Sequence, residues 1–281
     1  MTFGPSASLT WPKHRPGRPS DRCRNTSPRL QVTKNVSPLL QTCLHAITYA
    51  DPLRIPPQRL TAMQHDSMQP ARMPQSAVPY VYTAIAPTHD WLAVLVEAKA
   101  RAFGLQQLAV QNGEHVLEVA VGTGLSFTEL VSANPDGWTE GLDRTPAMLR
   151  QTARRMQTAP HQRFGLRLGD AYALPYPDNT FDAVLNSYMF DMLPVADFTT
   201  VLREFRRVLK PGGRCVCINM TVPTHWTERL WDTLYALFPP LLGGCRGITL
   251  APSMRKAGFA DVRRTRIVQR TFPSEIVVGF C

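Results

Sequence analysis

A short apolar strand, residues 115–121, runs directly into a turn that carries two glycines. The strand is apolar and rich in valine apart from Glu118, and Gly122 and Gly124 follow it at once. Glycines in such a turn let a bound nucleotide lie against bare backbone, and the helix that begins after the turn offers free N–H groups to an anion. The pattern therefore predicts the first strand, turn and helix of a nucleotide-binding α/β domain.

An acidic residue, Asp143, follows the next apolar strand, residues 138–142, and lies 25 residues after Glu118. A carboxylate at the tip of the second strand of such a domain can accept hydrogen bonds from the hydroxyls of a ribose. The other interpretation is a surface aspartate that caps the helix opened by Thr145 and Pro146. The spacing favours the ribose role.

The elements that must position these residues alternate along the chain. Apolar runs predict strands and apolar spacing of three to four residues predicts helices, with turn residues between them. The expected strands are 115–121, 138–142, 164–168, 182–187 and 213–220, and the expected helices are 125–134, 146–157 and 195–209. Such alternation predicts a parallel sheet with helices on both faces.

Further elements flank this alternating region. Residues 91–103 have helical apolar spacing, and Gly104 is expected to end that helix. The remaining segments are a helical stretch at 227–238, a short helix at 251–256 and two strands at 262–268 and 275–280. These two strands are expected to pair antiparallel at the sheet edge, joined through Pro273.

The first 79 residues differ in composition from the rest. They contain 12 of the 25 prolines and no Glu, and residues 1–72 hold ten Lys or Arg and three Asp, so that +7 of the formal charge of +10 lies there. We expect this leader to be disordered and to precede a domain at 80–281. It resembles an organelle transit peptide or an upstream extension of the reading frame. The true start would then be Met63, Met68 or Met73. The expected location is the cytoplasm, or an organelle matrix or stroma if the leader is a transit peptide.

The rest of the chain gives no independent sign of nucleic-acid binding, because only +3 of the charge lies outside the leader. Six cysteines without a C-x-x-C pair or zinc-like spacing to His predict reduced thiols and no metal site. Cys215 and Cys217 are expected to be buried structural thiols on one face of a strand. Since no apolar run reaches the roughly 18 to 20 residues of a membrane span, the protein is expected to be soluble or at most peripheral.

Four stretches, in order and spacing, resemble one family. Residues 118–124 resemble the E-x-G-x-G-x-G loop of class I S-adenosylmethionine-dependent methyltransferases, with Ala120 in the first glycine place. A dinucleotide-binding turn would instead carry a third glycine where Phe127 stands. The second stretch is the strand 138–142 with Asp143 and the helix start that follows it. The run 168–184 resembles the family's segment between strands three and four, and 202–213 resembles its Lys-Pro-Gly-Gly corner.

The resemblance implies a Rossmann-like α/β fold, with a seven-stranded, mostly parallel sheet and an antiparallel C-terminal edge pair. It implies S-adenosylmethionine as the cofactor and S-adenosylhomocysteine as the product. Asp170 would accept a hydrogen bond from the adenine amino group, the Ala171 N–H would face the ring, and Tyr188 would favour the positive charge. The residues expected around the cofactor are Glu118, Ala120, Gly122, Thr123, Gly124, Asp143, Arg144, Met148, Asp170, Ala171 and Ser187.

Within this family, the chain looks most like the branch of ubiquinone and menaquinone biosynthesis C-methyltransferases and bacterial phospholipid N-methyltransferases. It departs from the quinone enzymes where substrate would bind. Phe190-Asp191-Met192 stands in place of an Arg-Asn pair, and His89-Asp90 stands in place of a Tyr-Asp pair. The resemblance implies a small-molecule acceptor that is apolar or lipid-like, of the quinone or phospholipid class.

The implied reaction is an in-line attack on the methyl carbon of a sulfonium, with donor and acceptor held together and water excluded. A general base is needed only if the acceptor is a weakly acidic carbon or hydroxyl. The candidates are His89, Asp191 and His225. Each has an ordinary alternative, since a loop histidine is often only solvent-exposed, and Asp191 could cap the helix that follows Pro194.

A last pattern is the recurrence of Trp226, Leu230, Leu234 and Leu237 at helical spacing. It predicts either core packing or a lid over an apolar acceptor, in contact with a membrane surface.

Three other functions compete with the methyltransferase reading. One is a nicotinamide-dependent oxidoreductase, and another is an S-adenosylmethionine-binding protein without turnover, which keeps the fold and loses the reaction. The third, a nucleic-acid methyltransferase, lacks support because residues 186–189 do not match the Asn/Asp-Pro-Pro-Tyr pattern of amino-directed base methylases.

Overall fold

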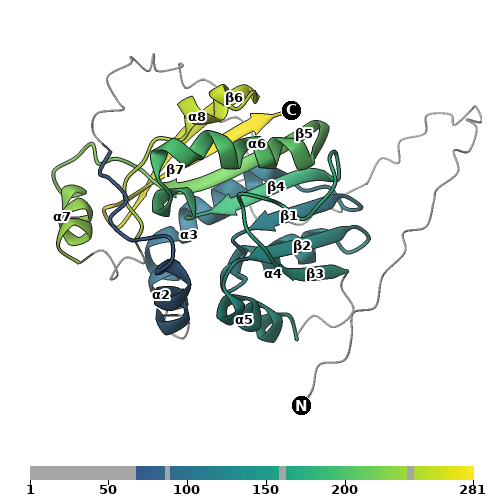
Figure 1. Ribbon diagram of the computed structural model, residues 1–281, viewed down its shortest axis with the longest axis horizontal. Coiled ribbons are helices and arrows are strands. Elements are labelled where there is room, and N and C mark those ends of the chain that lie inside the picture. The colour runs from purple at the N-terminus through teal and green to yellow at the C-terminus, as the bar shows by residue number, and fades with distance from the viewer. Residues whose placement is uncertain (1–67, 86–88, 158–162, 239–243) are drawn as a thin grey trace, which may run out of the picture. The chain divides into compact units, whose positions relative to one another are not determined.

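A seven-stranded sheet with the strand order β3-β2-β1-β4-β5-β7-β6 lies at the centre of the structure (Figure 1). The computed structural model describes residues 68–85, 89–157, 163–238 and 244–281. Its strands are β1 (His115–Val119), β2 (Trp138–Asp143), β3 (Phe164–Leu168), β4 (Phe181–Ser187), β5 (Leu209–Met220), β6 (Ala260–Gln269) and β7 (Phe272–Phe280). The first five strands pair in parallel, and β7 pairs antiparallel with both β5 and β6. The predicted fold, with its antiparallel pair at one edge, is confirmed.

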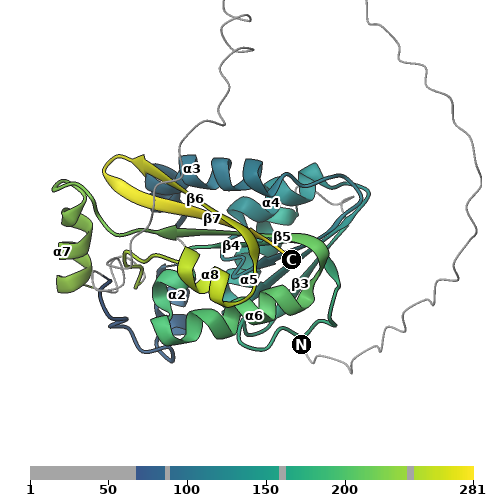
Figure 2. The ribbon, with the colours of Figure 1, turned by 90° about the horizontal axis from the view of Figure 1, so that it is seen from above.

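Helices cover both faces of this sheet, and in Figure 2 α3 and α4 lie on one side while α6 and α8 lie on the other. The helices are α2 (Val78–Ile85), α3 (His89–Leu108), α4 (Leu125–Ala133), α5 (Pro146–Met156), α6 (Phe198–Val208), α7 (Arg229–Leu237) and α8 (Ala251–Lys256), with short 3-10 turns η2 (Phe190–Met192) and η3 (Val195–Asp197). Within the described ranges, none of these helices is both long and apolar enough to cross a membrane.

Side chains along β5 point alternately to the two layers of helices. Cys215 and Cys217 are fully buried on the face that packs against α6 and α8, as predicted for structural thiols. Val216 and Ile218 point to the opposite face and pack against α3 and α4. This period of two is what a central strand with helices on both faces requires.

The structure differs from the sequence predictions at the ends of several elements. The helix expected to stop at Gly104 continues to Leu108. Gly104 does not end the helix but allows close packing, since a Cβ at this position would collide with the Ile218 side chain. The edge pair is joined at Arg270 and Thr271 rather than through Pro273, which lies inside β7. Both turn residues have positive φ, 48° and 67°, as a type I′ hairpin turn requires.

Order also begins earlier than the predicted Tyr80. Met73 and Val78 are buried in the core, so the segment from Met68 belongs to the packed structure. Residues 1–67, where the rest of the leader was predicted, lie outside the described residues.

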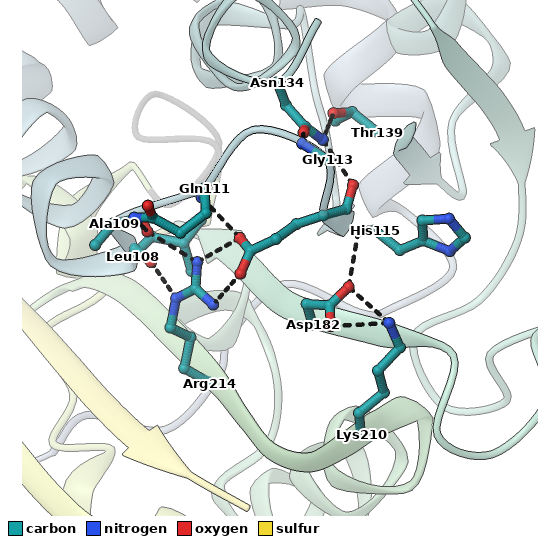
Figure 3. A network of polar contacts seen from close by, with 11 residues as sticks. Leu108, Ala109, Gln111, Gly113, His115, Asn134, Thr139, Asp182, Lys210 and Arg214 are labelled. Carbon is teal, nitrogen blue, oxygen red and sulfur yellow. Dashed lines mark hydrogen bonds and ion pairs between the residues drawn. The ribbon is translucent and has the colours of Figure 1, made fainter. Parts of the chain in front are cut away.

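Charged side chains tie together the amino ends of β1, β4 and β5 (Figure 3). Arg214 donates to both carboxylate oxygens of Glu114, at 2.9 and 2.7 Å. Asp182 accepts from Lys210 Nζ at 2.7 and 2.8 Å and from the His115 N–H at 2.8 Å. Burial of Asp182 acts to raise its pKa, but these hydrogen bonds outweigh it and the pKa is lowered.

Candidate functional site

A cavity of about 910 Å³ lies at the opposite edge of the sheet, where the parallel strands end. Its walls include the residues that end or follow β1, β2, β3 and β4, the edge at which open α/β sheets bind ligands. Ten of the eleven residues predicted around a cofactor line it: Glu118, Ala120, Gly122, Thr123, Asp143, Arg144, Met148, Asp170, Ala171 and Ser187. The structure therefore brings these ten residues together at one cavity, of which they form part of the wall.

The eleventh residue, Gly124, shapes the turn from behind the cavity wall. It is the N-cap of α4 with φ 84°, and a Cβ there would collide with the Thr152 side chain. Gly122 and Ala120, both with φ 58°, face the cavity. The turn is left-handed at all three places where the family has glycine, although Ala120 is an L-residue for which this conformation is strained.

Asp143 holds this turn and also faces the cavity. Its Oδ2 accepts a hydrogen bond from the Gly122 N–H at 2.9 Å, and its Oδ1 accepts one from the Thr145 N–H at 2.8 Å. The side chain is 6% exposed, so the alternative of a surface aspartate is wrong. Burial raises the pKa of Asp143, while the two backbone hydrogen bonds oppose that shift. The Thr145 side chain also donates to this carboxylate, which still has acceptor capacity for a ligand hydroxyl.

Two buried polar atoms at the cavity have no partner in the described structure. They are Oε2 of Glu118, at the end of β1, and Oγ of Ser187, at the end of β4. Burial raises the pKa of Glu118 well above its usual value. Since native proteins leave few buried polar groups unsatisfied, these two atoms are suited to contact a polar ligand.

The remaining predicted positions fit around them. Asp170 is exposed, and its Oδ1 accepts from the Tyr172 N–H at 3.1 Å, while the neighbouring Ala171 is buried. The Thr123 hydroxyl donates to the carboxylate of Asp90 in the first turn of α3. The helix before the sheet is thus tied to the glycine turn through the aspartate of the His89-Asp90 pair.

The second half of the cavity is mostly apolar, and the sequence analysis named only Tyr188 and Met192 of its main residues. It is built from segments before and after the strands that carry the motifs, and no motif marks it. Its main residues are Val78, Tyr82, Val96, Glu97, Tyr188, Met189, Met192, Leu193, Trp231, Phe238, Cys245 and Phe272.

Glu97 is the acidic residue of this apolar half. It lies on α3, one turn before Arg101, and makes no hydrogen bond to the described residues. Burial, and then the charge of Asp191, raise its pKa to about 8, while Arg101 opposes the shift. Tyr82 and Tyr188 line the same space, and burial raises the pKa of both hydroxyls. A carboxyl group with such a pKa can both donate and accept a proton near neutral pH.

Of the three residues predicted as general-base candidates, Asp191 and His225 are not among the described residues that line the cavity. Asp191 is fully buried behind it in η2, where its Oδ2 accepts from the Met220 N–H at 3.0 Å and burial raises its pKa to about 7. It does not cap the helix after Pro194, because the N-cap of α6 is Asp197. His225 is exposed, and its N–H donates to Glu228 Oε2 at 3.2 Å. His89 is the first residue of α3, and its side chain is outside the described part.

Comparison with known proteins agrees with this geometry. Residues 116–213 match a family model described as a methyltransferase domain. Over 170 residues the chain is 34% identical to a demethylmenaquinone methyltransferase from Listeria welshimeri, a match that covers 58% of this chain and 71% of the relative. A demethylmenaquinone methyltransferase from Symbiobacterium thermophilum is 42% identical over 119 residues, which cover 42% of this chain and 47% of that relative.

Solved structures share the fold at lower identity. A putative methyltransferase from Haloferax volcanii, solved with an activator protein, has a TM-score of 0.57 and 20% identity over 72% of this chain and 96% of its own. The cyclase SpnF has a TM-score of 0.52 and 18% identity over 65% of this chain and 79% of its own. The fold alone therefore does not fix a reaction. The match to the Listeria relative does fix the family, and this chain belongs to the class I S-adenosylmethionine-dependent methyltransferases.

Proposed function

We propose that this protein transfers a methyl group from S-adenosylmethionine to a small apolar acceptor of the quinone class. The observation that supports this most is that one cavity combines a polar end, at the glycine turn, with a long apolar end that no cofactor contact requires. The relatives named above are described as demethylmenaquinone methyltransferases, which agrees with an aromatic, apolar acceptor.

The polar end fits the cofactor. Asp143 offers carboxylate oxygens to ribose hydroxyls, and Asp170 with the Ala171 N–H offers an acceptor and a donor to adenine. The unpartnered atoms of Glu118 and Ser187 would gain partners from the amino-acid part of the ligand. When bound, S-adenosylmethionine supplies a methyl group on a positively charged sulfur, and the buried Glu118 carboxylate favours that charge.

The apolar end would hold the acceptor and exclude water. Rings and thioethers of Tyr188, Met189, Met192 and Phe272 offer a surface on which a flat aromatic ring can pack. Desolvated walls of this kind hold donor and acceptor at reacting distance and keep water from competing.

Glu97 is the group that we assign to proton transfer with the acceptor. A hydroquinone carbon becomes a better nucleophile as a ring hydroxyl loses its proton, and a carboxylate with a pKa of about 8 is a base of suitable strength. Asp191 and His225, two of the general-base candidates from the sequence, are not among the residues that line the cavity.

Labelled S-adenosylmethionine tests the proposal when the protein is given reduced demethylmenaquinone, phosphatidylethanolamine or RNA in separate reactions. We expect label in the quinol alone. Label in phosphatidylethanolamine would move the acceptor to the phospholipid class. Cofactor binding without transfer, to these acceptors or to any fraction of a cell extract, would instead favour a binding protein without turnover.

The packing beside the glycine turn argues against the nicotinamide-dependent oxidoreductase. Phe127 occupies the place of the third glycine and is fully buried, with its ring 5.9 Å from that of Phe164 in an edge-on contact. Gly141 on β2 makes room for this ring, because a Cβ there would collide with it. The helix therefore packs on the sheet through an aromatic side chain, where a dinucleotide-binding turn packs through glycine.

A further inference from the structure

The outer side of α7 is apolar and exposed. Trp226, Leu230, Leu237 and Phe238 are 83%, 57%, 65% and 63% exposed, and we call these four residues the α7 surface. Leu230 and Leu237 are seven residues apart, which places them on one side of α7, while Trp226 lies in the turn before the helix and Phe238 directly follows it. Core packing, the ordinary prediction for this stripe, is therefore wrong. In Figure 1, α7 stands at one end of the sheet, apart from the layers that cover its faces.

The inner side of α7 is, by contrast, fully engaged. Tyr235 is buried, and its hydroxyl donates to the Pro70 carbonyl at 3.1 Å. The Trp231 ring packs edge-on against Phe272 at 5.0 Å, and its N–H donates to Thr271 Oγ1 at 3.2 Å. The helix is thus held firmly while its outer side lacks a partner among the described residues.

The α7 surface is continuous with the cavity. Phe238 is 63% exposed and at the same time lines the cavity, and Trp231 lines it from the inner side of the same helix. An apolar molecule that enters past Phe238 would reach the cavity along apolar surface, which avoids the cost of exposing it to water.

The charges around this surface are basic. Arg72, whose guanidinium donates to the Ala236 carbonyl at 2.8 Å, Arg229 and Arg270 are exposed. The two carboxylates of the stretch 224–238 are withdrawn: Asp232 is only partly exposed, and Glu228 is buried in an ion pair with Arg266. Bulky apolar side chains with a basic rim are complementary to the surface of an anionic lipid bilayer.

We propose that the α7 surface is a docking site for an anionic lipid bilayer and sets the mouth of the cavity against the lipid. The tryptophan and the basic rim favour a bilayer interface over a wholly apolar partner, because they combine apolar bodies with groups suited to headgroups. This inference goes beyond the proposed function, since it concerns where the protein meets a lipid phase and not which acceptor it methylates.

Co-sedimentation of the full chain with lipid vesicles tests it without any acceptor. The vesicles are phosphatidylcholine with phosphatidylglycerol, and phosphatidylcholine alone. The test variant combines Trp226→Gln, Leu230→Gln and Leu237→Gln, none of which lines the cavity. The matched control is Leu168→Gln, which removes a leucine that is 59% exposed at the end of β3.

We expect the wild type and the control to bind the anionic vesicles and the triple variant to bind at least about tenfold more weakly. All three keep the basic leader, so electrostatic binding by that segment cannot produce the difference. Unchanged affinity for S-adenosylhomocysteine in the triple variant shows that it is folded.

Quenching of tryptophan fluorescence by brominated lipids adds a local readout. The wild type should be quenched, and Trp226→Phe should lose most of the quenching. Equal vesicle binding by wild type and triple variant would overturn the proposal, and so would quenching that survives Trp226→Phe. It would also fail if the wild type bound no vesicles, or if ultracentrifugation showed that this face only joins two copies of the chain.

Discussion

Two glutamates near the two ends of β1 have opposite surroundings. Glu114, just before the strand, accepts both Arg214 hydrogen bonds and one from the Gln111 N–H at 2.9 Å (Figure 3). Glu118, four residues later, is 2% exposed and leaves Oε2 without a partner in the described structure. At the amino end of β1 the carboxylate is paired with a cation, whereas at the carboxyl end a carboxylate oxygen lacks a partner among the described residues.

This contrast extends across the sheet and separates stability from binding. At the amino ends, Lys210 neutralises Asp182, so these charges are satisfied by the protein itself. At the carboxyl ends, Glu118 Oε2 and Ser187 Oγ are buried at a cavity without a partner among the described residues, and Glu97 of α3 lines the same cavity. Groups left in this state cost stability and are typical of sites completed by a ligand.

The largest effect is expected from breaking the satisfied end. Arg214→Ala removes the partner of Glu114 and the donor to the Ala109 carbonyl, at 3.0 Å, in a partly buried site. We expect the free energy of unfolding to fall by about 3 kcal/mol, because a partly buried carboxylate loses its counter-charge. Urea unfolding measures this, with the exposed Arg203→Ala as a control that should change stability by no more than about 0.5 kcal/mol. A parallel loss of cofactor affinity in the folded variant would contradict the view that the amino ends of the strands serve stability and the carboxyl ends serve binding.

The next effect should come from the binding end. Asp143→Ala removes the acceptor proposed for the ribose and the acceptor of the Gly122 N–H. We expect S-adenosylhomocysteine, at micromolar affinity in the wild type, to bind more than tenfold more weakly, which corresponds to about 1.4 kcal/mol or more. Calorimetry measures it. The matched control is Asp182→Ala at the amino end, which should lose stability and keep affinity; equal affinity in Asp143→Ala would remove the ribose assignment.

The buried carboxyl group of Glu97 should make stability depend on pH. Its pKa is raised from 4.5 to about 8, so the folded state holds a proton that the unfolded state has released between these values. The stabilisation is complete below pH 4.5 and is lost as the pH rises toward 8, with a slope of up to about 1.4 kcal/mol per pH unit. Glu97→Gln should flatten this part of the profile, whereas Glu129→Gln, a carboxylate that is 55% exposed, should not.

Unfolding in urea at several pH values between 5 and 8 gives the slopes. Equal slopes in the wild type and Glu97→Gln would show that the carboxyl group is not held in an uncompensated site. If reduced demethylmenaquinone is a substrate, Glu97→Gln should also lower kcat by about 100-fold, while cofactor affinity stays unchanged.

The smallest effect concerns the glycine turn itself. Ala120 holds a left-handed conformation with φ 58°, which is strained for an L-residue. Ala120→Gly should relieve this strain at some cost in the entropy of the unfolded chain, for a net gain of up to about 1 kcal/mol in unfolding free energy. Cofactor affinity should change little. A clear loss of stability would mean that the Ala120 methyl group packs in the cavity wall.

The sequence predicted those parts of the molecule that depend on local signals. The strands, the glycine turn and the N-cap at Thr145 could be predicted because their signals are local: apolar runs, glycines that need positive φ, and a Thr-Pro helix start. The acids at strand ends could be assigned to the cavity because parallel strands end on one side of the sheet.

The apolar half of the cavity could not be predicted, because it depends on packing between distant segments. Glu97 lies in a helix whose sequence gives no sign of which side faces the cavity. Gly104 suggested a helix end, yet it serves close approach to Ile218. Arg246 is fully buried and donates to the carbonyls of Gln69 and Leu193, at 2.6 and 2.7 Å, in a contact that joins segments 177 residues apart.

The most direct test of the account is a crystal structure of the full chain with S-adenosylhomocysteine. The ribose hydroxyls are predicted to lie on Asp143, the adenine beside Asp170 and Ala171, and the amino-acid part against the unpartnered atoms of Glu118 and Ser187. A ligand bound elsewhere, with those two atoms still unpartnered, would contradict the claim that the carboxyl end of the sheet is the cofactor site.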